Sequence, residues 1–297
     1  MKTELESPAD GLPALEASNR NGAEHQAKVD AHFELHSTGW RDVYHDDGVE
    51  GAIYRKRLEI ILEWIDKLAT PAGEKALEIG CGGGRMTVAL AQRGYNVSAI
   101  DSAANMLAIT RQHAANMKVG EFISTNLGDA HALNFPNQTF ALVVAVGVAP
   151  YLHSPRNALA EMARVVRPNG CVLVTAGNRW RLGHLVDPWL FPAIQPMRTV
   201  LRKLLRRPEK SHSSSKWPPI RFDSIRDMDR WLSNAGLTRI KTTTVGFPAQ
   251  TVFERMIVGS GLAIKLNEIL QRLVDHDVPG IKWAGMDYVV LAKKLAG

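Results

Sequence analysis

The sequence contains little cysteine and no long apolar run. Of its 297 residues only two are cysteine, Cys81 and Cys171, and they lack C-x-x-C spacing. This excludes a disulfide framework and a zinc knuckle, and it indicates two reduced thiols. No uninterrupted apolar stretch reaches transmembrane length, and the first residues show no secretory signal pattern. We therefore expect a cytoplasmic globular protein, in keeping with an apolar content of 45%.

Positive charge is not spread along the chain but concentrated in one segment. Residues 179–207 contain seven lysines and arginines and one aspartate, a local charge of +6 that equals the formal charge of the whole chain. The balanced remainder argues against a general nucleic-acid-binding composition. Within residues 189–207 cations alternate with apolar residues, which predicts a basic amphipathic helix. Such a helix serves as a lid over a substrate or lies peripherally on a membrane, with a solvated helix face as the alternative.

The chain divides into an N-terminal region and a long α/β region. Residues 1–30 are polar and show no periodicity, which predicts a disordered arm. Residues 31–70 combine aromatic residues with apolar residues at helical spacing, which predicts a helical cap. Residues 71–297 form the main domain. In it we expect a lid insertion at 178–220 and a helical insertion at 247–285.

From residue 75 onward, apolar strands alternate with helices. The predicted strands lie at residues 75–80, 95–101, 121–126, 140–147, 171–176, 238–245 and 288–291. Strict alternation produces right-handed βαβ units and therefore a parallel sheet. The fold class is thus α/β, with a Rossmann-like, seven-stranded, mostly parallel sheet and helices on both faces.

The strongest functional motif follows the first predicted strand. Residues 78–84 read E-x-G-x-G-x-G, between a buried strand and a helix. Glycine permits positive φ and lets a ligand lie against the backbone, and the start of the helix offers free N–H groups. A dinucleotide site would need G-x-G-x-x-G, but Arg85 and Thr87 stand where the third glycine is required. The loop therefore favours a nucleotide ligand other than NAD.

This motif resembles the first motif of the class I S-adenosylmethionine-dependent methyltransferases of the UbiE type, and later segments match the same family in order. Residues 101–107 are similar to its D-x-S-x-x-M-L, and residues 128–130 to its adenine-binding turn. Residues 135–144 resemble F-P-…-F-D-x-V-x, with Ala141 in place of the aspartate, and residues 163–170 resemble L-x-R-V-L-K-P-G-G. The resemblance covers about residues 74–176 and again 224–246.

The resemblance implies S-adenosylmethionine as the cofactor and suggests its contacts. Asp101 ends the second strand, where its carboxylate can accept both ribose hydroxyls. The resemblance implies that the Asp129 carboxylate accepts a hydrogen bond from the adenine amino group. It also implies that a tyrosine of the helical cap, here Tyr44, closes over the methionine end of the cofactor. The cofactor residues expected from the resemblance are Tyr44, Glu78, Gly80, Cys81, Gly82, Asp101, Ser102, Met106, Asp129, Ala130, His131 and Val146.

The acceptor is expected in the crevice at the carboxyl ends of the strands. The W-R-x-x-Y segment at residues 40–44 and the basic insertion are similar to those of magnesium-protoporphyrin methyltransferases. The aromatic and histidine side chains near this crevice could instead serve only in packing. The sequence shows no cluster of metal ligands. We expect Trp40, Tyr54, Arg57, Tyr151, Trp180 and His184 to bind the substrate, and Tyr151 and His153 to be catalytic.

Together these features predict methylation of a carbon or oxygen atom of a hydrophobic, anionic small molecule. A prenyl diphosphate, a quinone precursor or a polyketide acid would fit, with carboxyl O-methylation of a tetrapyrrole-like acid as the alternative. Residues 146–155 lack the N-P-P-[YF] motif of amino-directed enzymes, which disfavours a nucleic-acid methyltransferase. A binding module without catalysis is the other class, and the intact cofactor motif argues against it.

Overall fold

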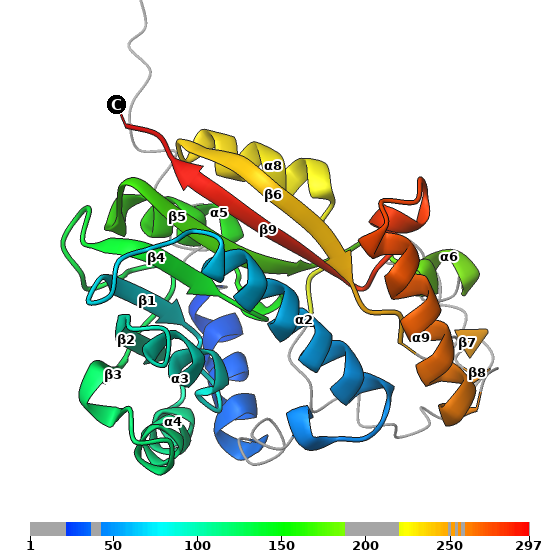
Figure 1. The fold of residues 1–297 in the computed structure, drawn as a ribbon, viewed down its shortest axis with the longest axis horizontal. Helices are drawn as coiled ribbons and strands as arrows, with labels where there is room; N and C mark the ends of the chain where they lie inside the picture. Colours follow the sequence, from blue (N-terminus) through cyan, green and yellow to red (C-terminus); the bar gives the residue numbers. More distant parts are fainter. Residues whose placement is uncertain are drawn as a thin grey trace, which may run out of the picture.

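A seven-stranded sheet forms the centre of the protein (Figure 1). The computed structural model describes residues 22–36, 43–187, 220–248, 251–252, 255–256 and 259–296. Three features of the sequence analysis lie outside these residues: the first 21 residues of the predicted arm, Trp40 and the basic segment 189–207.

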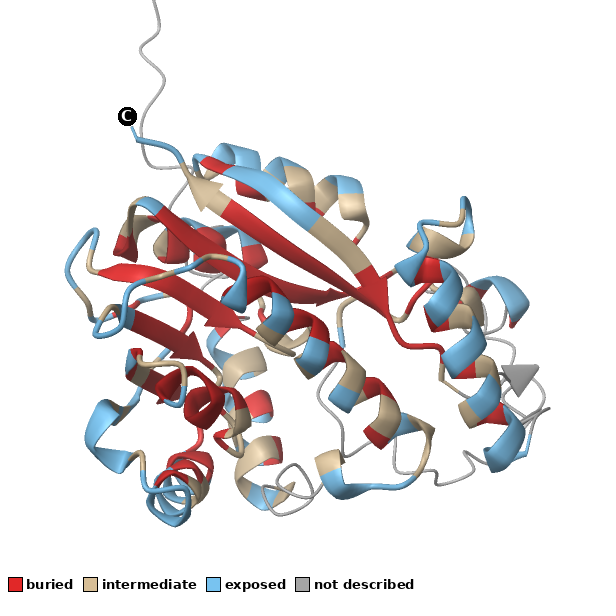
Figure 2. Ribbon diagram, viewed as in Figure 1, coloured by how far each residue is buried: buried red, intermediate tan, exposed pale blue. Residues whose placement is uncertain are grey.

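The sheet has the predicted, mostly parallel arrangement. Its strand order is β3-β2-β1-β4-β5-β9-β6, and β9 runs antiparallel to both of its neighbours while the other pairs are parallel. All six residues of β4 are buried, as expected for a central parallel strand covered on both faces (Figure 2). The strands are β1 (Lys75–Ile79), β2 (Asn96–Asp101), β3 (Ile123–Leu127), β4 (Phe140–Ala145), β5 (Val166–Gly177), β6 (Leu237–Val245) and β9 (Asp287–Lys294).

Helices cover both faces of the sheet. On one face, α2 and α3 pack through residues such as Trp64 and Leu90, and on the other, α5 and α8 pack through Leu159 and Leu232. Each face therefore has its own apolar cluster, which confirms the predicted two-sided layering. The helices are α2 (Val49–Asp66), α3 (Arg85–Ala91), α4 (Ala104–Asn116), α5 (Pro155–Val165), α6 (Leu182–Val186), α8 (Ile225–Asn234) and α9 (Ser260–Asp275).

Shorter elements complete the connections. Single helical turns of the 3-10 type are η1 (Val43–His45), η2 (Gly120–Phe122), η3 (Ala149–Tyr151) and η6 (Ile281–Trp283). The helical insertion also contains a two-stranded hairpin, β7 (Thr251–Val252) with β8 (Arg255–Met256), which the sequence analysis does not predict. Within the described ranges, no helix combines the length and the apolar content needed to cross a membrane.

The N-terminal arm differs from its prediction. Residues 22–36 form a helix, although the polar composition of residues 22–30 predicts a disordered arm. Ion pairing and hydrogen bonding one helical turn apart, from Lys28 to Glu24 and from Gln26 to Asp30, support the helix locally, at 2.7 Å in both cases. Val29 is buried against the rest of the protein. Tertiary contact therefore stabilises a segment whose polar composition gives little periodic signal.

Candidate active site

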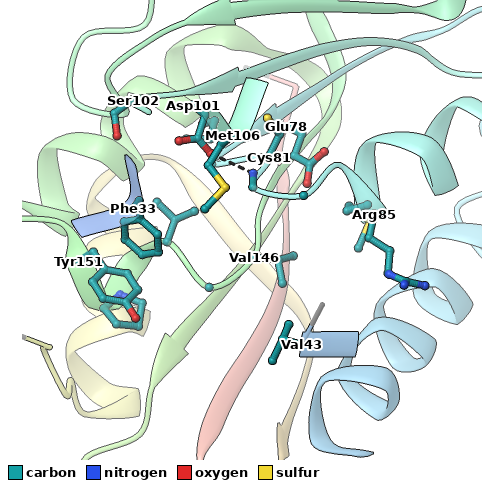
Figure 3. A pocket seen from close by; sticks show the side chains of 18 of the residues that line it. Phe33, Val43, Glu78, Cys81, Arg85, Asp101, Ser102, Met106, Val146 and Tyr151 are labelled. Carbon is teal, nitrogen blue, oxygen red and sulfur yellow. Dashed lines mark hydrogen bonds between the residues drawn. The ribbon is translucent and has the colours of Figure 1, made fainter. Parts of the chain in front are cut away.

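A cavity of about 600 Å³ lies at the carboxyl ends of the parallel strands. Its walls come from the loops after β1, β2, β3 and β4, from residues 22–36, from α2 and from the start of β9. Such a volume is typical of a site for a small molecule or cofactor. Figure 3 shows Glu78, Cys81 and Asp101 gathered at the glycine loop, with Phe33 and Tyr151 together on another wall.

The glycine loop after β1 presents open backbone to this cavity. Gly80 and Gly82 have φ of +68° and +52°, a region that side chains rarely adopt. A Cβ on Gly80 would collide with the side chain of Val148. A Cβ on Gly82 would meet no protein atom within 4 Å, and Gly82 lines the cavity. The absence of a side chain at Gly82 therefore leaves room for a ligand against the backbone.

Asp101 connects the end of β2 with the glycine loop. Its Oδ2 accepts from the Gly82 N–H at 2.9 Å, and its Oδ1 accepts from the Ala103 N–H at 3.0 Å. Burial raises the pKa of this carboxyl above its ordinary value, against the opposing effect of these backbone hydrogen bonds. Both oxygens keep a second lone pair, so Asp101 can also accept from hydroxyl groups of a ligand in the cavity.

Glu78 lies beneath the same loop and is almost fully buried. Burial raises the pKa of its carboxyl to about 8, although the Thr87 hydroxyl, which donates to it, acts in the other direction. Burial likewise raises the pKa of the Cys81 thiol. At neutral pH, with the cavity free of ligand, the side chains of Glu78 and Cys81 are therefore largely uncharged.

The turn after β3 contributes Asp129 and Ala130 to the cavity lining. His131, which was expected to contact the cofactor, is not part of the lining but holds Asp129 in place. Its backbone N–H and its ring Nδ1 donate to Asp129 Oδ1 at 2.9 and 2.7 Å. Burial alone would raise the pKa of Asp129, but these hydrogen bonds hold it below its ordinary value.

The opposite part of the cavity is aromatic. Phe33 meets Tyr151 edge to face with ring centroids 4.9 Å apart, and Arg57 lies over the Tyr54 ring at 4.6 Å. Burial raises the pKa of Tyr54 to about 12 and that of Tyr151 as well, so both hydroxyls stay protonated at neutral pH. Phe222, which follows the lid insertion, lines the same part.

A buried ion pair joins the cap to the last strand at this end of the cavity. Arg57 Nη1 donates to Asp287 Oδ2 at 2.7 Å, and both side chains are largely shielded from solvent. Burial would lower the pKa of Arg57, but the Asp287 carboxylate raises it above its ordinary value. The two residues are 230 positions apart in the chain. Their pairing depends on β9 starting at the edge where the parallel strands end.

Three residues expected to bind substrate or to catalyse lie outside the lining. His153 stacks on His131 with ring centroids 3.7 Å apart, and burial together with that neighbour lowers its pKa. His184 is buried, its Nδ1–H donates to the Arg179 carbonyl at 2.8 Å, and its ring lies edge to face with that of Phe222. Trp180 is half exposed. None of these three side chains lines the cavity.

The remaining predicted residues are brought together. Cavity-lining positions expected from the sequence are Tyr44, Tyr54, Arg57, Glu78, Gly80, Cys81, Gly82, Asp101, Ser102, Met106, Asp129, Ala130, Val146 and Tyr151. Phe33, Arg181, Phe222 and Asp287 also line the cavity, although no motif in the sequence predicts a site role for them. The position of Asp287 at the start of the last strand places it beside the site only once that strand is known to be antiparallel.

Comparison with known proteins identifies the chemistry to which this cavity is related. Residues 77–174 match the methyltransferase domain family. A ubiquinone biosynthesis O-methyltransferase from Azoarcus sp. (strain BH72) is 30% identical over 176 residues, which span 59% of this chain and 69% of that relative.

Solved structures of low sequence identity share the fold. Magnesium protoporphyrin IX methyltransferase (ChlM) from Synechocystis PCC 6803 with bound SAH superposes with a TM-score of 0.60 at 15% identity, covering 91% of this chain and 99% of that one. The [4+2]-cyclase SpnF superposes with a TM-score of 0.58 at 17% identity, covering 91% and 96% of the two chains. The shared fold thus includes proteins named for different reactions, and the fold alone does not specify the reaction.

Proposed function

Because the chain belongs to the class I S-adenosylmethionine-dependent methyltransferases, we propose that it methylates an oxygen atom of a hydrophobic small molecule. A phenol or quinol of the quinone-precursor type is the first acceptor class to test, since the Azoarcus relative is named for O-methylation in ubiquinone biosynthesis. The observation that carries the proposal is the division of one cavity into a glycine-loop half and an aromatic half.

The glycine-loop half fits the cofactor. S-adenosylmethionine, when bound, supplies an electrophilic methyl group on a sulfonium sulfur. Gly82 leaves open space beside the backbone, and the buried Asp101 carboxylate faces the same space with lone pairs for the ribose hydroxyls. Asp129, held by His131, stands at the adenine end. These residues come from the ends of β1, β2 and β3, which are neighbours in the sheet.

The aromatic half fits a flat apolar acceptor. Phe33, Tyr54 and Tyr151 provide ring surface, and residues 22–36 cover the cavity from outside. A covered site excludes water and holds the acceptor in line with the methyl group. Alignment of this kind contributes about 7–11 kcal/mol to catalysis. In this proposal the cap supplies positioning rather than covalent chemistry.

An oxygen acceptor must also give up its proton. Tyr151 is suited to orient the acceptor oxygen by a hydrogen bond rather than to remove a proton, because its raised pKa keeps the hydroxyl protonated. His153 lies outside the lining. Asp287 lines the aromatic half, and its Oδ2 is engaged by Arg57. We assign the second oxygen of Asp287, Oδ1, as the proton acceptor.

The proposal is tested with purified protein, S-adenosylmethionine and a panel of phenols and quinols, with products identified by mass spectrometry and by the chemical shift of the new methyl group. We expect a methoxy product that requires the wild-type cavity and disappears in the Gly82→Val variant. Transfer to carbon would contradict the oxygen assignment, and methylation of neutral amines alone would contradict the acceptor class. Tight binding of S-adenosylhomocysteine without turnover on any phenol or quinol would count against the reaction itself.

A further inference from the structure

Two arginines line the aromatic half of the cavity, and their surroundings differ. Arg57 is neutralised by Asp287 at 2.7 Å. Arg181, four residues after the end of β5, forms no ion pair with the described residues, and its Nε is buried without a hydrogen-bond partner. Its guanidinium lies over the Phe222 ring with 4.5 Å between the central carbon and the ring centroid. In the aromatic half of the cavity, Arg181 is therefore an arginine whose charge is not paired by any described carboxylate.

Such a cation is costly for the fold. A buried charge is normally paired, because desolvation is unfavourable unless another charge or several hydrogen bonds compensate. Burial lowers the pKa of Arg181, and the more distant Asp287 offsets this only in part. The cation–π contact with Phe222 contributes less free energy than the desolvation of a charge costs. The contacts of Arg181 with the described residues therefore do not offset the cost of burying its charge.

The backbone around Arg181 is held firmly. Its N–H donates to the carbonyl of Asn178 at 3.3 Å. The Asn178 side-chain amide in turn donates to the carbonyls of Trp283 and Gly285, at 2.7 and 2.8 Å, and Asn178 is fully buried. Because its anchor is fixed and its guanidinium rests on Phe222, Arg181 presents its donors from a defined place on the cavity wall.

That place is on the acceptor side. Arg181 follows β5, whereas Gly82 follows β1, and β4 lies between these two strands. Two strand spacings of about 4.8 Å separate the strand ends by roughly 10 Å. The glycine loop, which fits the cofactor, and the anchor of Arg181 therefore follow different strands, and a molecule extending from the methyl-transfer position toward β5 would approach Arg181.

We propose that Arg181 binds an oxyanion of the acceptor, a carboxylate or phosphate at the end remote from the methylated oxygen. A guanidinium presents a planar fork of N–H donors that matches both kinds of oxyanion. Phe222 supports the plane of the guanidinium. Because Arg57 is already paired with Asp287, the negative charge of a bound acceptor would be balanced by Arg181. This inference rests on the proposed function, which it extends from a hydrophobic acceptor to an acidic one. Arg181 is thus a specificity residue that does not touch the reacting atoms.

The first test measures binding, so it does not depend on turnover. Para-hydroxybenzoate, para-hydroxybenzamide and phenyl phosphate are titrated into protein saturated with S-adenosylhomocysteine. We expect the wild type to bind at least one of the two anions at least tenfold more tightly than the neutral amide. Arg181→Gln should remove that preference, and Arg181→Lys should retain part of it. Arg156→Gln, which removes the same charge from an exposed position on α5, should leave it unchanged.

Several results would overturn the inference. Equal wild-type binding of the anions and the amide would show that no oxyanion is recognised. A loss of S-adenosylhomocysteine affinity in Arg181→Gln would show that the guanidinium serves the cofactor. Efficient methylation of neutral phenols with no effect of Arg181→Gln would leave the proposed function intact and remove this extension of it.

A second measurement uses the protein without ligand. Arg181→Met keeps an apolar side chain over Phe222 but removes the unbalanced charge, so it should raise the melting temperature of the free protein. Arg57→Met leaves the buried Asp287 carboxylate without its partner, so it should lower the melting temperature. A lower melting temperature for Arg181→Met would identify Arg181 as a structural residue and overturn the assignment.

Discussion

The backbone N–H of Gly82 donates to Oδ2 of Asp101 at 2.9 Å, and this bond fastens the glycine loop after β1 to the end of β2. The same carboxylate faces the cavity. One side chain therefore both shapes the loop and offers hydrogen-bond acceptors to the ligand that the loop receives.

Asp101→Asn should weaken binding of S-adenosylhomocysteine by about 1.5–3 kcal/mol, because an amide nitrogen replaces one of the two accepting oxygens. Isothermal titration calorimetry measures this directly. NAD serves as the control ligand, and neither protein should bind it. An unchanged affinity in Asp101→Asn would remove this carboxylate from the cofactor site, and a clear NAD isotherm would contradict the cofactor assignment.

Gly82→Ala tests the open space beside the loop. The new Cβ projects into the cavity, so cofactor binding should fall by at least tenfold, while positive φ costs the fold about 1–2 kcal/mol. Gly73→Ala is the matched control, because Gly73 also has positive φ (+85°) and free space but does not line the cavity. Both variants should lose similar thermal stability, and only Gly82→Ala should lose affinity. Equal affinities in the two variants would show that the ligand does not approach Gly82.

Glu78 makes the stability of the ligand-free protein depend on pH. Its pKa is about 8 in the folded state against an ordinary value of 4.5, so between these values the folded state retains a proton that the unfolded state has lost. The contribution of Glu78 to stability therefore falls as pH rises through this window and levels off above about pH 8. Glu78→Gln stays neutral and escapes that loss, which is on the order of 4 kcal/mol.

Thermal unfolding of wild type and Glu78→Gln at pH 5 and pH 8.5 measures this difference. The melting temperatures should lie close together at the lower pH, and the variant should be the more stable at the higher pH. A constant difference across the range would mean that Glu78 is ionised in the folded protein at all of these pH values.

Phe33→Ala tests whether residues 22–36 close the acceptor half of the cavity. The variant removes an edge-to-face contact with Tyr151, worth about 0.5–1.5 kcal/mol, and should speed amide exchange in residues 22–36. The KM for the acceptor should rise several-fold while S-adenosylhomocysteine affinity changes little. Leu35→Ala, at a site 77% exposed on the same helix, is the control and should change neither quantity. Unchanged exchange in Phe33→Ala would mean that other contacts hold the helix.

The sheet and the glycine loop were predictable because their signals are local. Strand and helix periods alternate along the chain, and the motif at residues 78–84 specifies a strand, a turn and a helix in order. Residues 22–30 were not predictable in this way. They contain few apolar residues, and the helix is held by distant partners, such as the Tyr151 carbonyl, which accepts from His25 Nε2 at 2.7 Å.

The acceptor half of the site was only partly predictable for a similar reason. Arg57 was expected there, but its partner Asp287 is assigned only by the antiparallel placement of β9. Arg181 belongs to a segment whose net charge is visible in the sequence, yet a count of charges does not show which cation turns into a cavity. Buried charge depends on tertiary environment, and the sequence reports only composition.

The strand order β5-β9-β6 has a consequence for how the protein is made. The last strand of the described chain lies between two strands that are synthesised earlier, so β6 has no sheet neighbour on that side until β9 leaves the ribosome. The residues at the ends of β1, β2 and β3 are all synthesised before β9. The aromatic half of the cavity forms only after Asp287 has been synthesised. In a nascent chain arrested before β9, Arg57 would lack its partner and that half of the cavity would be incomplete.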